Sequence, residues 1–302
     1  DEGTHLDEWN EAIAEYGSRY LTLPPERLIS ELSADVYTVQ QTMARIGTGD
    51  RKFPEWCGVM SMLSLLTAKT LSNLGHQAEA RRWWATAQSA ADRSGDPKLS
   101  LTVAGEGLIR ALYAERPTRM VLAKADEVRE RYPAVPCAGL TSLHSARAQA
   151  LVREGRTDEA IAAIRDLRAV AEKLPDSVIK NRDSLFGWGE DRLLYTTAWV
   201  HAYAGRAEAA DENARRATAA LPANDLRSPT QLALIQGIGH VRAGDVTEGV
   251  RHARRGYENH PPEQRTTMID HLANQVLAAV PAQRRAEPAV TEFRDLLVSA
   301  RV

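Results

Sequence analysis

Histidine and carboxylate side chains are the groups of this 302-residue chain that could hold a metal ion or transfer protons. The eight histidines form neither a His-Glu-x-x-His motif nor another recognisable zinc spacing. His240 and His252 could meet across a helical hairpin, but two imidazoles do not complete a zinc site. Asp158-Glu159 lies where a helix surface is expected, so we assign this pair to solvent. We therefore predict no metal site and no cofactor.

Nucleotide loops and activated nucleophiles are not indicated either. Gly105-Glu106-Gly107 and Gly237-Ile238-Gly239 carry paired glycines, but neither follows a predicted strand, as a nucleotide-binding loop would. No Gly-x-Ser-x-Gly motif occurs. Cys57 and Cys137 lie far apart, and we expect two packed, reduced thiols rather than a disulfide. The sequence therefore predicts that the chain is not an enzyme.

Composition argues against nucleic acid and membranes as direct partners. The 38 basic and 40 acidic residues give a formal charge of −2, so no overall field draws the chain to polyanions. The longest uncharged stretches, residues 132–146 and 228–241, are shorter than the ~18–20 apolar residues of a membrane span. The start, Asp1-Glu2-Gly3, is acidic and does not resemble an export signal. We expect a cytoplasmic protein.

Helical periodicity extends along almost the whole chain. Leu28, Leu32, Val36 and Val39 recur at spacings of three and four, behind a proline pair that suits a first helical turn. Strong helix formers supply most residues, and few segments alternate as strands do. The sequence predicts an all-α fold of roughly a dozen helices.

Short turns between these helices repeat. Each contains a glycine, a small residue five positions later and another small residue seven positions earlier, which would let two helices of a hairpin approach closely. The turn glycines are Gly75, Gly155, Gly205 and Gly244. The long interval between the first two predicts a further, degenerate unit within residues 103–132.

This pattern resembles the tetratricopeptide (TPR) repeat, in which each unit is a helix–turn–helix. The resemblance implies an all-α, TPR-like α-solenoid of about five to six helical hairpins with a concave face. We place an N-terminal helical cap or linker at residues 1–54 and the repeat domain at residues 55–302. An irregular helical bundle is the alternative.

Three further segments, residues 6–20, 56–92 and 186–190, resemble the C-terminal region of actinomycete-type Xre-family transcriptional regulators. In that family a helix-turn-helix head binds DNA and a TPR-like region follows, so the head is expected before Asp1. More distantly the chain is similar in architecture to peptide-sensing regulators of the RRNPP type. Residues 31–54 mimic a helix-turn-helix, but Arg45 is the only basic residue between Val36 and Ile46, so we expect one amphipathic helix there.

A stripe on the first helix of each hairpin would face the groove of a TPR-like solenoid. Counted from the turns, it mixes aromatic, guanidinium and amide side chains, which suit a peptide or a small acidic or aromatic molecule. Packing between hairpins is the alternative role for these aromatics. We assign Trp84 to a hairpin core and Trp83 to a half-exposed contact. The candidate ligand-binding residues are Glu106, Arg110, Tyr113, Gln149, Arg153, Trp188, Arg192, Tyr195, Trp199, Tyr203 and Gln231.

The resemblance and the groove together predict a ligand-sensing and dimerisation region of a transcriptional regulator. Its partners would be a small signalling molecule or short peptide and a second copy of the chain. DNA would be bound only through the upstream head. The alternative is a TPR adaptor that binds a peptide segment of another protein.

Overall fold

A computed structural model describes residues 2–300, with side chains from Leu6 to Ala300. Across this range the chain is all-α and contains no strand, which confirms the predicted fold class. By internal contacts it forms two compact units. The first comprises residues up to 146 together with 169–188, and the second comprises 147–168 together with the residues from 189 onward.

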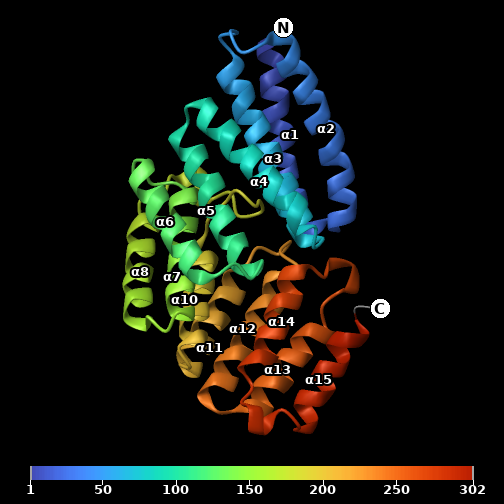
Figure 1. Cartoon of the computed structure of the whole chain (residues 1–302), viewed down its shortest axis with the longest axis vertical. Coiled ribbons are helices and arrows are strands. Elements are labelled where there is room, and N and C mark those ends of the chain that lie inside the picture. The colour runs from blue at the N-terminus through green and yellow to red at the C-terminus, as the bar shows by residue number, and fades with distance from the viewer. Residues whose placement is uncertain (1, 301–302) are drawn as a thin grey trace. The chain divides into compact units, whose positions relative to one another are not determined.

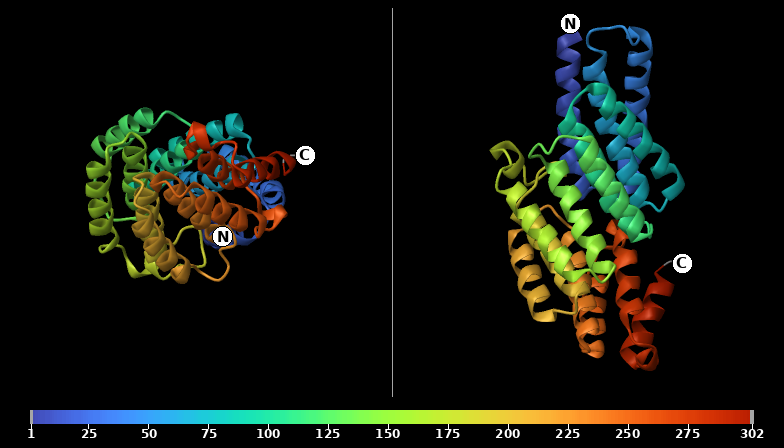
Figure 2. Two further views of the ribbon diagram at one scale, coloured as in Figure 1. Left: turned by 90° about the horizontal axis from the view of Figure 1, so that it is seen from below. Right: turned by 60° about the vertical axis from the view of Figure 1, so that its left-hand side comes forward.

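The first unit is built mainly from six long helices. α1, α2 and α3 lie side by side (Figures 1 and 2), and their apolar faces share one core that includes Leu28, Leu32 and Leu63. α2 is a single continuous helix, so the segment that mimics a helix-turn-helix is the amphipathic helix expected. The helices of this unit are α1 (Glu2–Thr22), α2 (Pro25–Ile46), α3 (Phe53–Asn73), α4 (Gln77–Ser94), α5 (Pro97–Tyr113), α6 (Thr118–Arg131), the start of α7 (Ala138–Arg153) and the short α9 (Asp176–Ile179).

The second unit continues the series of helical hairpins, with α10 paired to α11 and α12 paired to α13. Its core includes Trp199, Ile238, Tyr257 and Phe293, all of which are buried. Its helices are the end of α7, most of α8 (Thr157–Ala171), α10 (Glu190–Tyr203), α11 (Ala207–Ala220), α12 (Ser228–Ala243), α13 (Val246–Glu258), α14 (Thr267–Ala279) and α15 (Pro288–Ser299), with 3-10 turns at Pro262–Gln264 and Ala282–Arg284.

The turns between paired helices use the predicted glycines. Gly75, Gly155, Gly205 and Gly244 all have positive φ values, between 71° and 106°, which glycine adopts without steric penalty. The degenerate hairpin is also present, as α5 and α6. Its turn places a glutamate, Glu115, at φ 56° in the left-handed region.

Small residues at the predicted positions bring the paired helices together. Ala68, Ala148 and Ala198 have 0% exposure. At the fourth unit a Cβ added to Gly237 would lie 2.8 Å from both the Cβ of Ala253 and the carbonyl oxygen of Gly249. The spacing of small residues therefore reports real helix contacts.

Candidate functional site

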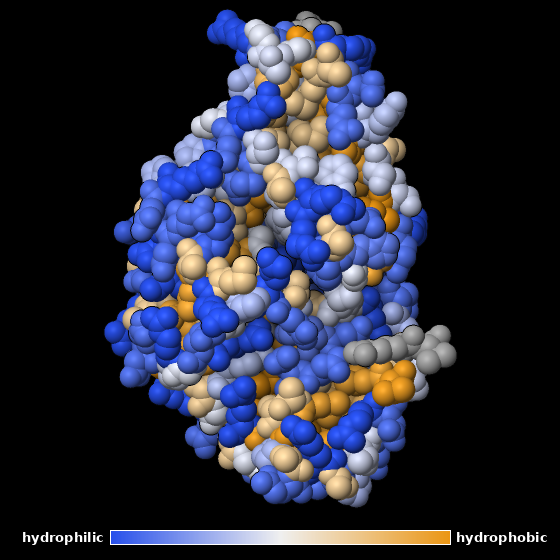
Figure 3. All heavy atoms as spheres, in the orientation of Figure 1, coloured by the Kyte–Doolittle hydropathy of each residue, from blue (hydrophilic) through white to orange (hydrophobic). Residues whose placement is uncertain are grey.

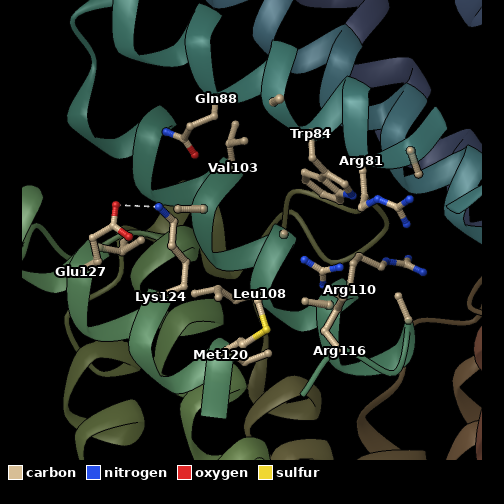
Figure 4. Close-up of a pocket in the computed structure, with 18 of the residues that line it drawn as sticks. Arg81, Trp84, Gln88, Val103, Leu108, Arg110, Arg116, Met120, Lys124 and Glu127 are labelled. Carbon is tan, nitrogen blue, oxygen red and sulfur yellow. Dashed lines mark hydrogen bonds and ion pairs between the residues drawn. The ribbon is translucent and has the colours of Figure 1, made fainter. Parts of the chain in front are cut away.

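A pocket of about 580 Å³ lies within the first unit, between α4, α5 and α6. Its apolar surface comes from Trp84 on α4, Val103 and Leu108 on α5, and Met120 and Val121 on α6 (Figure 4). In the space-filling view, apolar residues are exposed where α4 and α5 face one another (Figure 3). Met120 is 51% exposed, which is unusual for so large an apolar side chain. The pocket therefore offers apolar area that a ligand could cover.

A glycine on α5 leaves room for the indole of Trp84. A Cβ added to Gly107 would lie 3.6 Å from that ring, so the ring packs directly against the helix backbone. The preceding glycine, Gly105, serves another contact, because a Cβ there would strike the carbonyl oxygen of Gly139 on α7. The paired glycines of residues 105–107 are thus packing positions on two faces of one helix.

Three arginines gather at one end of the pocket. Arg81 extends from α4, Arg110 from α5, and Arg116 from the turn before α6 (Figure 4). Arg81 and Arg116 are exposed, whereas Arg110 is buried. Within residues 6–300, no carboxylate lies at ion-pair distance from any of the three. This end of the pocket carries positive charge that the protein itself leaves unneutralised.

The opposite end of the pocket is electrostatically balanced. Lys124 pairs with Glu127 at 2.6 Å, and Arg131 pairs with Asp92 at 2.7 Å (Figure 4 shows the first pair). Tyr132 donates a 2.6 Å hydrogen bond to Asp92. The local charges therefore cancel where α6 ends.

Hydrogen bonds hold Asp92 in its ionised form. Burial opposes ionisation, but bonds from Tyr132, Gln88 and Ser100, together with Arg131, lower the pKa of Asp92. Conversely, burial and the bond to Asp92 raise the pKa of Tyr132 to about 12, so its hydroxyl stays neutral at physiological pH. This network fixes α4, α5 and the residue after α6 relative to one another.

Arg110 connects the pocket to the unit's core. Its guanidinium donates to the side-chain oxygen of Asn73 at 2.8 Å and to the hydroxyl of Tyr20 at 2.6 Å. Asn73 also donates to that hydroxyl at 2.8 Å. Both acceptors of Arg110 are neutral, so this buried cation has hydrogen-bond partners but no counter-charge among them.

One helical turn earlier, Glu106 sits among polar partners. It pairs closely with Lys69 on α3 and accepts a 2.8 Å hydrogen bond from Ser142. Lys69 is almost fully buried, and burial lowers its pKa although Glu106 acts against that shift. Of the predicted groove residues in the first unit, Glu106 and Arg110 are therefore joined by one buried polar network. Tyr113 and Trp188 are also buried there.

The remaining predicted residues lie in the second unit. Tyr195 donates a 3.1 Å hydrogen bond to Gln231, while Trp199 and Tyr203 stack with centroids 4.8 Å apart. Trp199 has 0% exposure. Gln149 is also buried, whereas Arg153 and Arg192 are half-buried. The structure brings the α10 aromatics together as a packed cluster, and a role for them in ligand binding stays a prediction.

Sequence reasoning did not find most of the pocket. Trp84 packs on the small core of Leu65, Ala87 and Val103, as its assignment to a hairpin core predicted, but it also lines the pocket. Arg81, Arg116 and Met120 carried no signal, because each is unremarkable on its own helix. Only Arg110 belongs both to the predicted set and to the pocket lining.

Two further observations and the comparisons complete the description. His240 and His252 do meet, with ring centroids 6.5 Å apart, but no group of three or more potential ligands in the described residues is arranged to hold a metal ion. None of the described helices combines the length and apolarity that crossing a membrane requires. Scans against protein-family models, curated proteins and solved structures gave no significant match to the chain.

Proposed function

We propose that this chain is the ligand-sensing region of a transcriptional regulator, and that the sensed molecule binds between α4, α5 and α6. The pocket itself carries this proposal. Its volume of about 580 Å³ falls within the range of small-molecule sites, and its apolar lining with a few polar groups at the ends is typical of them. A partner's peptide segment would instead need an extended groove, so we favour a small molecule over the adaptor function.

A route from the pocket to the start of the chain supports a sensing role. Arg110 lines the pocket, and its partner Tyr20 lies on α1. The resemblance to Xre-family regulators places a DNA-binding head upstream of α1. A ligand that binds one arrangement of Arg110 more tightly than another would shift the balance between arrangements of α1. Homodimerisation and a cytoplasmic location belong to the same proposal.

The occupancy of the pocket can be tested with a neutral apolar dye, N-phenylnaphthylamine, whose fluorescence rises on transfer from water to an apolar site. We expect saturable binding to the folded chain. Ala111→Leu enlarges a half-buried residue of the pocket lining and should abolish most of the signal. Ala123→Leu makes the same change at an exposed position of α6 outside the pocket and should leave it intact.

Equal binding by both variants, or no saturable binding to the wild-type chain, would contradict the proposed site. Native mass spectrometry of the chain purified from its own host tests the rest of the proposal. A dimer that carries a small bound mass is expected. An empty monomer would shift weight to the adaptor alternative.

A further inference from the structure

We infer that the ligand of the α4–α6 pocket is an amphipathic anion, with its carboxylate, phosphate or sulfonate group between Arg81, Arg110 and Arg116. Its apolar body would lie across Trp84, Leu108 and Met120. This inference rests on the proposed function and specifies the chemical class of the ligand.

The distribution of charge carries the first step. Five basic residues and one acidic residue line the pocket. Two of the basic residues, Lys124 and Arg131, pair with carboxylates at the end of α6. The other three belong to different parts of the fold, yet they converge at the opposite end without a carboxylate among them (Figure 4). Guanidinium groups grip carboxylate and phosphate oxygens through paired hydrogen bonds.

Arg110 provides the second, independent observation. It is 8% exposed, and its two hydrogen bonds go to the neutral oxygens of Asn73 and Tyr20. A guanidinium has five N–H donors, so further donors remain for a ligand. Removing a cation from water without a counter-charge is unfavourable, and an anionic head group would supply that charge. The neighbouring cation, Lys69, already has Glu106.

The polarity of the pocket also sets the orientation of the ligand. Asp92 stays ionised beside Arg131 and Tyr132, and Glu127 lies on the same side. An anionic group placed at that end would meet like charge. The apolar part of the ligand therefore points toward Gln88 and Val128, with the exposed Met120 covering it.

A matched pair of dyes tests the class of ligand. Anilinonaphthalene sulfonate differs from N-phenylnaphthylamine by one sulfonate group. We expect the sulfonate to bind at least about tenfold more tightly, which corresponds to ~1.4 kcal/mol, the order of a charge-assisted hydrogen bond. Arg81→Gln and Arg116→Gln should each weaken the sulfonate by about three- to tenfold and leave the neutral dye unchanged.

Two neighbouring arginines supply the controls. Arg82 and Arg119 are exposed on the same or the next helix but do not line the pocket, so Arg82→Gln and Arg119→Gln should change neither affinity. Decanoate and decyl phosphate should displace the bound sulfonate, whereas decyltrimethylammonium should not. The ratio of the two displacing concentrations would distinguish a carboxylate ligand from a phosphate ligand.

The outcomes separate the inference from the proposed function. Equal affinity for the two dyes, or equal losses in Arg81→Gln and Arg82→Gln, would overturn the anionic class while leaving the pocket as a binding site. Absence of binding by either dye, with Ala111→Leu indistinguishable from wild type, would remove the site itself.

Discussion

Arg110 on α5 donates a 2.6 Å hydrogen bond to the hydroxyl of Tyr20 on α1, across 90 positions of the sequence. Asn73 on α3 completes the triangle, donating to Tyr20 and accepting from Arg110. All three side chains are buried. Three helices are thus tied together at a point where apolar contacts alone would leave their rotation less defined.

Tyr20→Phe should lower the free energy of unfolding by roughly 1–3 kcal/mol, because two buried donors lose their shared acceptor. The ring remains, so the contact with the Lys69 ammonium is preserved. Urea unfolding followed by circular dichroism measures the change. Tyr37→Phe, at a 62% exposed position on α2, serves as the control and should be neutral. Equal stability of the two variants would show that the triangle contributes nothing.

Glu106→Gln should be more damaging, by about 3–5 kcal/mol, because it leaves the buried Lys69 ammonium without its carboxylate. Adding Lys69→Met in the same chain should recover most of that loss, since an apolar side chain then fills the buried space. A double-mutant cycle by urea unfolding checks both statements. If the second substitution added its own loss instead, Lys69 and Glu106 would not depend on one another.

Acidification from about pH 7.5 to about pH 5.5 should destabilise the chain. Burial lowers the pKa values of His201, His252 and His260 in the folded state. The unfolded chain therefore binds protons first as pH falls through the ordinary histidine range, and each proton bound favours unfolding. Urea midpoints at several pH values measure the slope.

Substitution identifies the groups responsible for that slope. His260→Gln should flatten it, because this side chain is 2% exposed and lies beside two arginines, Arg227 and Arg265. His76→Gln, at an exposed position, should not alter it. A pH-independent midpoint in the wild-type chain would contradict the assignment.

A pair of glycines tests the close contact of α12 with α13. Gly237→Ala would place a methyl group 2.8 Å from Ala253 and Gly249, and overpacking of this kind destabilises by about 1–3 kcal/mol. Gly58→Ala, in the interior of α3, meets nothing nearer than 3.9 Å, so the helix should gain about 0.5–1 kcal/mol. Thermal unfolding compares the two. A stabilised Gly237→Ala variant would refute the contact.

The fold was largely predictable from sequence, because its signals are local. Gly75 and Gly155 mark turns by their own backbone requirements, and Ala68 and Ala148 mark helix contacts by size. The turn at Glu115 was predictable only by interval, since a glutamate in a left-handed conformation leaves no compositional trace. Each of these features involves residues within a few turns of one another.

The pocket was not predictable in the same way. It forms where α6 stands apart from α4 and α5, and this depends on how three helices pack rather than on the period of any one. Counting from turn glycines selected Arg110 but assigned Trp84 to the core alone. It also selected Trp199, which the structure buries completely. Groove positions inferred from an idealised repeat therefore shift when the hairpins pack at other angles.

The turn between α5 and α6 has a consequence for how a ligand enters. A non-glycine residue in the left-handed region is held there at a penalty of roughly 1–2 kcal/mol. Glu115 is the only such residue in the described chain, and the helix it precedes is one wall of the pocket. Relief of that penalty would partly offset the loss of contacts when α6 swings outward. We expect α6 to be the door of the pocket, with Glu115 as its sprung hinge, and its amides to exchange with solvent faster than those of α4.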